Sequence, residues 1–234
     1  MLEELPGTFA STRDALHALA EHVLARARYE AEGRIGLVPA DGGFGTPVFG
    51  DGERVRVDGT ELVQERPGTS TRIGITTLGA AARFVGAPLG APDVYTPATA
   101  CDRDVPLAVR ADAARVLAEW LAFASSLLEE LRGSYAHHAP SPATLWPEHF
   151  DLSCAIGRAD AGNGANFGAS PGDGAIAEPY LYVAPWEPER RVGRLGTHPW
   201  GAAVTYSELR AGSNPRGTGF EFLFEGAALL FGEP

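Results

Sequence analysis

A long helical pattern between residues 106 and 132 sets the architecture of this chain. Its apolar side chains step by three and four residues, the spacing that places them on one face of an α-helix. These side chains are Val109, Ala113, Val116, Trp120, Phe123, Leu127 and Leu131. We expect Asp104 to cap the helix, Pro106 to lie in its first turn and Gly133 to end it. At 1.5 Å per residue such a helix is about 40 Å long. We expect the rest of the hydrophobic core to pack against it.

The composition is typical of a globular protein. Of the 234 residues, 44% are hydrophobic and 21% are charged, so extended disorder is not expected. No stretch approaches the ~20 consecutive apolar residues that a bilayer crossing requires. Thirty acidic residues against 19 basic ones give a net charge of -11, and this excess repels phosphate backbones. We therefore expect no nucleic-acid partner and no membrane partner.

Two further features bear on chemistry and compartment. All 19 basic residues are arginine, which excludes a Schiff-base lysine and a phosphate-loop lysine. The first residues, MLEELPGTF, carry no basic and apolar leader pattern, so we expect no signal peptide. Cys101 and Cys154 are too few for a disulfide scaffold in a chain of this length. A cytoplasmic location with two free thiols is the simpler interpretation.

A first helix is predicted over residues 12–32, with Gly33 placed to end it. His17 and His22 on this helix raise the question of a metal site. Five positions at about 100° each place the two imidazoles roughly 140° apart around the axis, so they cannot hold one ion from the same face. We interpret them as half-exposed polar helix residues.

A β-rich stretch follows this helix. Asp58 and Gly59 stand between two alternating patterns and predict a hairpin, because both turn positions must accept positive φ. A short helix is then expected to begin after Thr76 or Thr77 and to run to Val85.

The second half reads as β-rich again. Residues 150–156 alternate as a strand, residues 162–174 (GNGANFGASPGDG) read as a turn-rich loop, and residues 178–186 (EPYLYVAPW) read as a strand. Residues 220–231 predict a terminal helix or strand.

Together these patterns predict an α+β protein whose β-rich N-terminal and C-terminal halves pack on the long central helix. We expect a helix, hairpin and strand unit over residues 1–86, a Pro-rich connector over 87–104, and the long helix with a β-rich unit over 105–234. One continuous domain is the alternative.

The most unusual stretch is WPEHFDLS, residues 146–153, which concentrates ionisable groups beside aromatic ones. In an extended strand His149, Asp151 and Ser153 would share one face. An imidazole beside a carboxylate can act as a general base, so we predict His149 as the base, Asp151 as its orienting partner, and Glu148 or Asp173 as an acid. The alternative is that His149 is simply hydrogen-bonded where the chain enters the strand.

Three other features of this half bear on whether it binds a metal, a nucleotide or another small molecule. His149 and Asp151 with His198 could ligate a metal, but no spacing requires it, and we predict no metal and no cofactor. The glycines at 162, 164 and 168 do not have the spacing of a dinucleotide-binding loop. Aromatic side chains can line an apolar pocket with polar tips. The predicted ligand-binding residues are Trp146, Tyr180, Tyr182 and Trp186.

The segments WPEHFDLS, NFGASPGDG and EPYLYVAPW, in this order, resemble those of a group of uncharacterised actinobacterial proteins. The resemblance covers roughly the last 90 residues best, and it implies no activity. Separately, the strand, hairpin, strand and helix order over residues 35–85 is similar to that of sterol-carrier-like domains, which hold apolar ligands.

The function expected from these observations is that of a soluble protein binding a small, partly apolar molecule. A hydrolase- or isomerase-type enzyme using His149 and Asp151 is the first alternative, and a non-catalytic scaffold or oligomerisation module is the second. A small-molecule ligand is the expected partner, and a homo-oligomer is left open.

Overall fold

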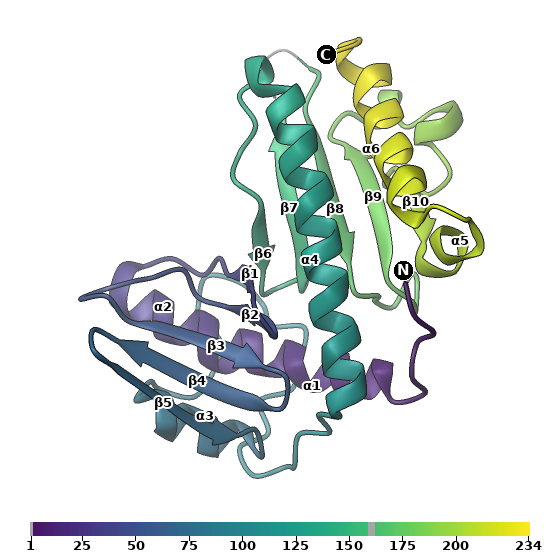
Figure 1. The fold of residues 1–234 in the computed structure, drawn as a ribbon. Helices are drawn as coiled ribbons and strands as arrows, with labels where there is room; N and C mark the ends of the chain where they lie inside the picture. The colour runs from purple at the N-terminus through teal and green to yellow at the C-terminus, as the bar shows by residue number, and fades with distance from the viewer. Residues whose placement is uncertain (1, 159–161) are drawn as a thin grey trace. The chain divides into compact units, whose positions relative to one another are not determined.

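The computed structural model describes residues 2–158 and 162–234, and it confirms an α+β fold with two antiparallel five-stranded sheets (Figure 1). The chain divides into two compact units. The N-terminal unit comprises Leu5–Ala122 and Leu145–Phe150, and the C-terminal unit comprises Met1–Glu4, Phe123–Thr144 and Asp151–Pro234. The division falls inside the long helix, and the Pro-rich residues 87–104 belong to the N-terminal unit.

The predicted first helix is present and is interrupted in its middle by a π turn. It consists of α1 (Phe9–Leu19), η1 (Ala20–Leu24, the π turn) and α2 (Ala25–Glu32). Gly33 ends it with a φ of 66°, a left-handed conformation that glycine adopts without strain. The π turn has no periodic signal in the sequence, since it depends on what its residues contact elsewhere.

The first sheet lies in the N-terminal unit and follows chain order. Its strands, in the order β1-β2-β3-β4-β5, are β1 (Val38–Ala40), β2 (Gly43–Gly45), β3 (Arg54–Asp58), β4 (Glu61–Arg66) and β5 (Thr69–Gly74). The predicted hairpin joins β3 to β4, with Asp58 opposite Glu61 and Gly59 at a φ of 61°. Helix α3 (Leu78–Val85) then begins at Thr77, whose hydroxyl accepts a hydrogen bond from the Ala80 N–H at 3.1 Å.

The long helix α4 (Ala111–Ser134) is shorter at its start than predicted. Asp104 does not cap it and Pro106 does not lie in its first turn. Residues 107–110 instead have no regular secondary structure and are bonded to other segments: the Leu107 N–H donates to the Thr76 carbonyl at 2.8 Å, and the Arg110 N–H donates to the Thr12 hydroxyl at 3.1 Å. These bonds outweigh a further helical turn. Gly133 lies within the last turn rather than after it.

The second sheet has the order β10-β9-β8-β7-β6. Its strands are β6 (Thr144–Trp146), β7 (Asp151–Ile156), β8 (Ala165–Ser170), β9 (Tyr180–Pro185) and β10 (Ala202–Thr205). The prediction of a loop over residues 162–174 is wrong in its middle, because β8 is the central strand of this sheet. A Cβ at Gly164 would lie 1.9 Å from the Trp186 ring, and one at Gly168 would lie 2.5 Å from the Tyr182 ring. These two glycines therefore leave room for the ring of Tyr182 in β9 and for the ring of Trp186, the residue after β9.

Two helices cover one face of this sheet, as Figure 1 shows for α6 (Pro215–Phe231) and the part of α4 from Phe123 onward. Gly219 of α6 is close to both Leu181 and Leu127. Leu181 of β9 thus faces the helices, and the alternation of the strand turns its tyrosines to the other face. The remaining helices are α5 (Tyr206–Ala211), η2 (Ala136–His138), η4 (Pro188–Arg190) and η5 (Gly193–Leu195).

We predict that Trp120→Ala lowers the free energy of unfolding by about 3–5 kcal/mol, because Trp120 on α4 is fully buried and its removal leaves a large cavity. Urea unfolding followed by circular dichroism measures this loss. Glu119→Ala, on the exposed side of the same turn, should change stability by less than about 0.5 kcal/mol. Equal losses for both variants would contradict the role of α4 as the core spine.

Candidate functional site

The predicted strand face carrying His149, Asp151 and Ser153 is not formed as expected. His149 is exposed in the turn 147–150, and β7 begins only at Asp151. Phe150, between them, has a φ of 52°, and its N–H donates to the Trp146 carbonyl at 2.7 Å. A left-handed residue breaks strand alternation, so only Asp151 and Ser153 follow the predicted pattern.

Four of the predicted site residues do meet in the C-terminal unit. The Tyr182 hydroxyl donates a hydrogen bond to the Asp151 carboxylate, and the Tyr180 hydroxyl donates to Asp173 at 2.7 Å. The two tyrosine rings lie 6.1 Å apart, and the Trp200 ring lies 6.0 Å from each of them.

These tyrosines and carboxylates form two parallel chains of hydrogen bonds. Burial is the main cause that raises the pKa of each tyrosine, and the neighbouring carboxylate adds to it, so both phenols stay protonated as donors. Ser153 near Tyr182 and Ser170 near Tyr180 act in the opposite direction to the carboxylates and lower the tyrosine pKa.

Asp173 also accepts hydrogen bonds from the N–H groups of Ala175 and Ile176, at 2.7 and 2.9 Å. These bonds, with the one from Tyr180, engage Asp173 in holding the turn that follows β8. These hydrogen bonds therefore stabilise the tyrosine-bearing face of the second sheet and the turn after β8 that contains Asp173.

The two predicted tryptophans lie apart from this network in the chain. Trp186 follows the last residue of β9, and its indole N–H donates to the Asn166 side chain at 3.1 Å. Trp146 belongs to the N-terminal unit and its surface is 38% exposed. A hollow of about 220 Å³ in the C-terminal unit is lined by other residues, among them Leu195, Phe222 and Leu229.

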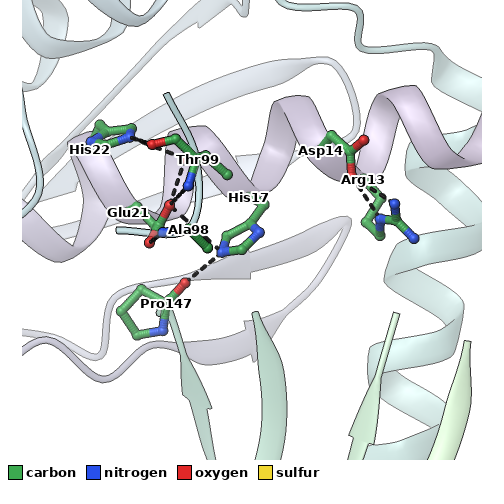
Figure 2. A network of polar contacts seen from close by, with 8 residues as sticks. All are labelled: Arg13, Asp14, His17, Glu21, His22, Ala98, Thr99 and Pro147. Atoms are coloured by element: carbon green, nitrogen blue, oxygen red, sulfur yellow. Dashed lines mark hydrogen bonds and ion pairs between the residues drawn. The ribbon is translucent and has the colours of Figure 1, made fainter. Parts of the chain in front are cut away.

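A second polar cluster lies within the N-terminal unit and centres on Glu21, in the π turn η1 (Figure 2). The Glu21 side chain has no exposed surface. Its carboxylate accepts hydrogen bonds from the Ala98 N–H at 2.9 Å, the Thr99 N–H at 2.8 Å and the Thr99 hydroxyl at 2.5 Å. Three donors to one buried carboxylate compensate for much of its lost hydration.

His22, the next residue, ties down the same segment. Its Nε2 lies 3.0 Å from the Thr99 carbonyl oxygen, which can only accept, so Nε2 is the donor in this hydrogen bond. The His22 carbonyl accepts the Gly90 N–H at 3.1 Å. We call residues 86–104 the strap, since Gly90 and Thr99 both fasten it to the π turn. A π turn departs from the regular helical bonding pattern and is often found at functional sites.

His17 stands one turn before Glu21. Its Nε2 donates to the Pro147 carbonyl at 2.8 Å and lies 3.8 Å from the Glu21 carboxylate (Figure 2). The His17 ring also stacks on Phe150, with the ring centroids 5.0 Å apart. Burial lowers the pKa of His17, against the opposing effects of Glu21 and the Pro147 carbonyl. The imidazole is therefore neutral at pH 7.

Tyr95 belongs to the strap, and Glu148 belongs to the turn 147–150 that contains Pro147. The Tyr95 hydroxyl and one Glu148 oxygen, Oε2, are buried and have no hydrogen-bond partner within residues 2–158 and 162–234. Burial raises the pKa of Tyr95, and the charges of Glu21 and Glu148 raise it further. A buried polar atom left without a bond costs about 1–3 kcal/mol, so each one calls for an explanation.

The prediction that His17 and His22 are half-exposed polar helix residues is wrong for His22, whereas His17 is partly exposed. His22 is 1% exposed and the His17 side chain is 15% exposed. The sequence feature that points to this cluster is the four-residue spacing of His17 and Glu21, which places both side chains on one helix face. Tyr95 and Thr99 carried no such signal. In the described part of the chain, no group of three His, Cys, Asp or Glu residues could hold a metal ion.

Comparisons of the chain with protein-family models, with curated proteins and with solved structures find no match. Among the helices that the structure describes, none combines the length and apolarity needed to cross a membrane.

We predict that Glu21→Gln lowers the free energy of unfolding by about 2–3 kcal/mol, because an amide cannot accept all three bonds and presents its own N–H groups to buried donors. Hydrogen exchange at the Ala98 and Thr99 amides should accelerate more than exchange in the first sheet. Glu30→Gln, on the exposed end of the same helix, is the matched control. Unchanged exchange at Thr99 would show that Glu21 does not hold the strap.

The neutral His17 predicts a pH dependence of stability. Because its folded pKa is below the unfolded value of 6.5, the unfolded chain binds the proton first as the pH falls. The stability associated with the neutral imidazole is present above about pH 6.5 and is lost as the pH falls towards the folded pKa. Between about pH 7.5 and pH 5, the wild type should lose more stability than His17→Gln, measured by urea unfolding. The exposed His149→Gln is the control and should follow the wild-type curve. Parallel curves for all three proteins would contradict a neutral, buried His17.

Proposed function

We propose that this protein binds a small, partly apolar molecule in the N-terminal unit, with Tyr95 and Glu148 holding the polar end of that molecule. The observation that carries the proposal is that two buried oxygen atoms, the hydroxyl of half-buried Tyr95 and Oε2 of half-buried Glu148, both lack a hydrogen-bond partner in the described chain. The tyrosines predicted to bind the ligand, Tyr180 and Tyr182, are less suited because their hydroxyls already donate to Asp173 and Asp151.

The chemistry of the two groups supports this choice. The raised pKa of Tyr95 keeps its hydroxyl protonated, so it can donate one hydrogen bond and accept another. Glu148 stands between buried Pro147 and the exposed His149, with buried Phe150 next in the chain. Apolar neighbours of this kind strengthen each polar contact by lowering the local dielectric.

A general acid–base enzyme is the second candidate, with His17 in the role first predicted for His149. The supporting observation is that the Pro147 carbonyl fixes the Nε2 proton of a neutral imidazole, which leaves Nδ1 as the basic nitrogen. Glu21, 3.8 Å away, would stabilise the imidazolium form during proton transfer. This function requires that the bound molecule be chemically changed, which the first proposal does not.

The proposal includes a cytoplasmic location, which the free thiols of Cys101 and Cys154 support, since free cysteines are typical of a reducing compartment. Relationship to the actinobacterial group through the WPEHFDLS, NFGASPGDG and EPYLYVAPW segments stays a prediction. So does the homo-oligomer, which light scattering would test.

A fragment screen by NMR tests the binding proposal. We expect fragments to shift the amide signals of Tyr95, Ala98 and Glu148, and we expect Tyr95→Phe to weaken their binding at least about tenfold, the equivalent of about 1.4 kcal/mol. Tyr29→Phe, which removes a tyrosine hydroxyl elsewhere in the same unit, should leave binding unchanged. Turnover of a bound fragment, lost in His17→Gln, would favour the enzyme instead.

The unliganded variant gives an independent test of the same observation. If the Tyr95 hydroxyl is unsatisfied in the free protein, Tyr95→Phe removes a buried polar group and should be neutral or stabilising by up to about 1 kcal/mol. A clear loss of stability would mean that an internal hydrogen bond or a bound water already satisfies this hydroxyl. Together with a screen in which no fragment moves these amides, that loss would overturn the proposal.

A further inference from the structure

We propose that the C-terminal unit carries a second binding site, which holds a free apolar α-amino acid such as leucine. The site is the hollow of about 220 Å³ in this unit. It is independent of the site proposed around Tyr95. The inference rests on an apolar space that has two opposite charges beside it.

The hollow lies between α6, β10 and the short helix η5, whose residues line it. Leu195 and Ala202 are buried parts of the lining, and half-buried Phe222 adds an aromatic ring. Leu229 also lines the hollow and is 58% exposed. An apolar group seated here would remove the Leu229 surface from water, which is favourable.

The volume of the hollow limits the size of the ligand. A cavity of about 150 Å³ can hold a benzene molecule, whereas pockets for drug-sized ligands measure about 300–1,000 Å³. A hollow of about 220 Å³ therefore suits one aliphatic or aromatic side chain rather than a larger molecule.

Arg194 of η5 and Glu225 of α6 supply the two charges. Both line the hollow, and they form an ion pair with each other. The Arg194 side chain is 75% exposed and that of Glu225 is 57% exposed, so the pair lies on the solvent side of the hollow. Exposed ion pairs contribute little to stability, because water screens them. A ligand can therefore replace this contact at little cost.

Two adjacent opposite charges select a zwitterion. A carboxylate matches the planar guanidinium of Arg194 through two parallel hydrogen bonds, and an ammonium group can donate to the Glu225 carboxylate. An α-amino acid carries both groups on the carbon atom that bears its side chain, so it can bond to both residues while the side chain enters the hollow. A simple amine or a simple acid would bond to one residue and leave the other without a partner.

The experiment titrates L-leucine into the 15N-labelled full chain while the amide signals of Leu195, Phe222 and Glu225 are followed. Three comparison compounds each remove one part of leucine: 3-methylbutylamine lacks the carboxylate, 4-methylpentanoate lacks the amine, and glycine lacks the side chain. We expect leucine to bind at least about tenfold more tightly than each of them. Equal binding of leucine and any one of the three would overturn the inference.

Two variants separate the two polar contacts. Arg194→Gln and Glu225→Gln should each weaken leucine binding at least about tenfold. Arg194→Gln should not weaken the binding of 3-methylbutylamine, and Glu225→Gln should not weaken that of 4-methylpentanoate. Arg216→Gln is the matched control, since it breaks an exposed ion pair of the same helix, with Glu130, and should leave leucine binding unchanged. A well-dispersed amide spectrum confirms that each variant is folded.

The result is distinguishable from that of the proposed function. Leucine should move amide signals of the C-terminal unit, and Tyr95→Phe should leave its binding unchanged. If leucine causes no saturable shift at the three amides, or if neither Arg194→Gln nor Glu225→Gln weakens its binding, this inference is wrong, whatever the fragment screen shows at Tyr95.

Discussion

A carboxylate with no exposed surface must find its hydrogen-bond donors inside the protein, and Glu21 imposes this requirement on the N-terminal unit. Its donors come from Ala98 and Thr99 of the strap. The π turn presents Glu21 and His22 together to that segment, and Gly90 bonds to the His22 carbonyl. A strap with little regular structure of its own is thereby held in one place, and Tyr95 is held with it. The candidate site depends on this anchoring.

Both units contain buried carboxylates that are engaged by hydrogen-bond donors. In the C-terminal unit, tyrosine hydroxyls and backbone N–H groups engage Asp151 and Asp173, so these side chains stabilise the outer face of β7, β8 and β9. In the N-terminal unit Glu21 is similarly engaged, but a Glu148 oxygen lacks a donor in the described chain. Binding sites are often found where polar groups remain unsatisfied, because a ligand can then supply the missing bond. We place the function in the N-terminal unit because it holds both Glu148 Oε2 and a second unpartnered atom, the Tyr95 hydroxyl.

Sequence reasoning succeeded where structure follows local spacing. The Asp58-Gly59 hairpin, the short helix from Thr77 and the strand of residues 180–185 all follow from periodicity and turn chemistry, and the structure confirms them. It failed where distant contacts override local preference. β8 is rich in glycine and small residues, yet it is a central strand because β7 and β9 supply its bonds and the Tyr182 ring occupies the space above Gly168.

The amino-acid sequence by itself determined the α+β class, the long central helix and most strands, since these depend on periods of 3.6 and 2 residues that can be read within a short window. Only the tertiary structure decided which polar side chains are buried and what they bond. Glu21 and Thr99 are separated by 78 residues, and no local pattern links them. His149 was central to the sequence prediction, yet it lies outside β7 and is exposed. The positive φ of Phe150 interrupts the extended backbone between His149 and Asp151, where β7 begins. Burial and hydrogen-bond pairing are long-range properties, and they select the site.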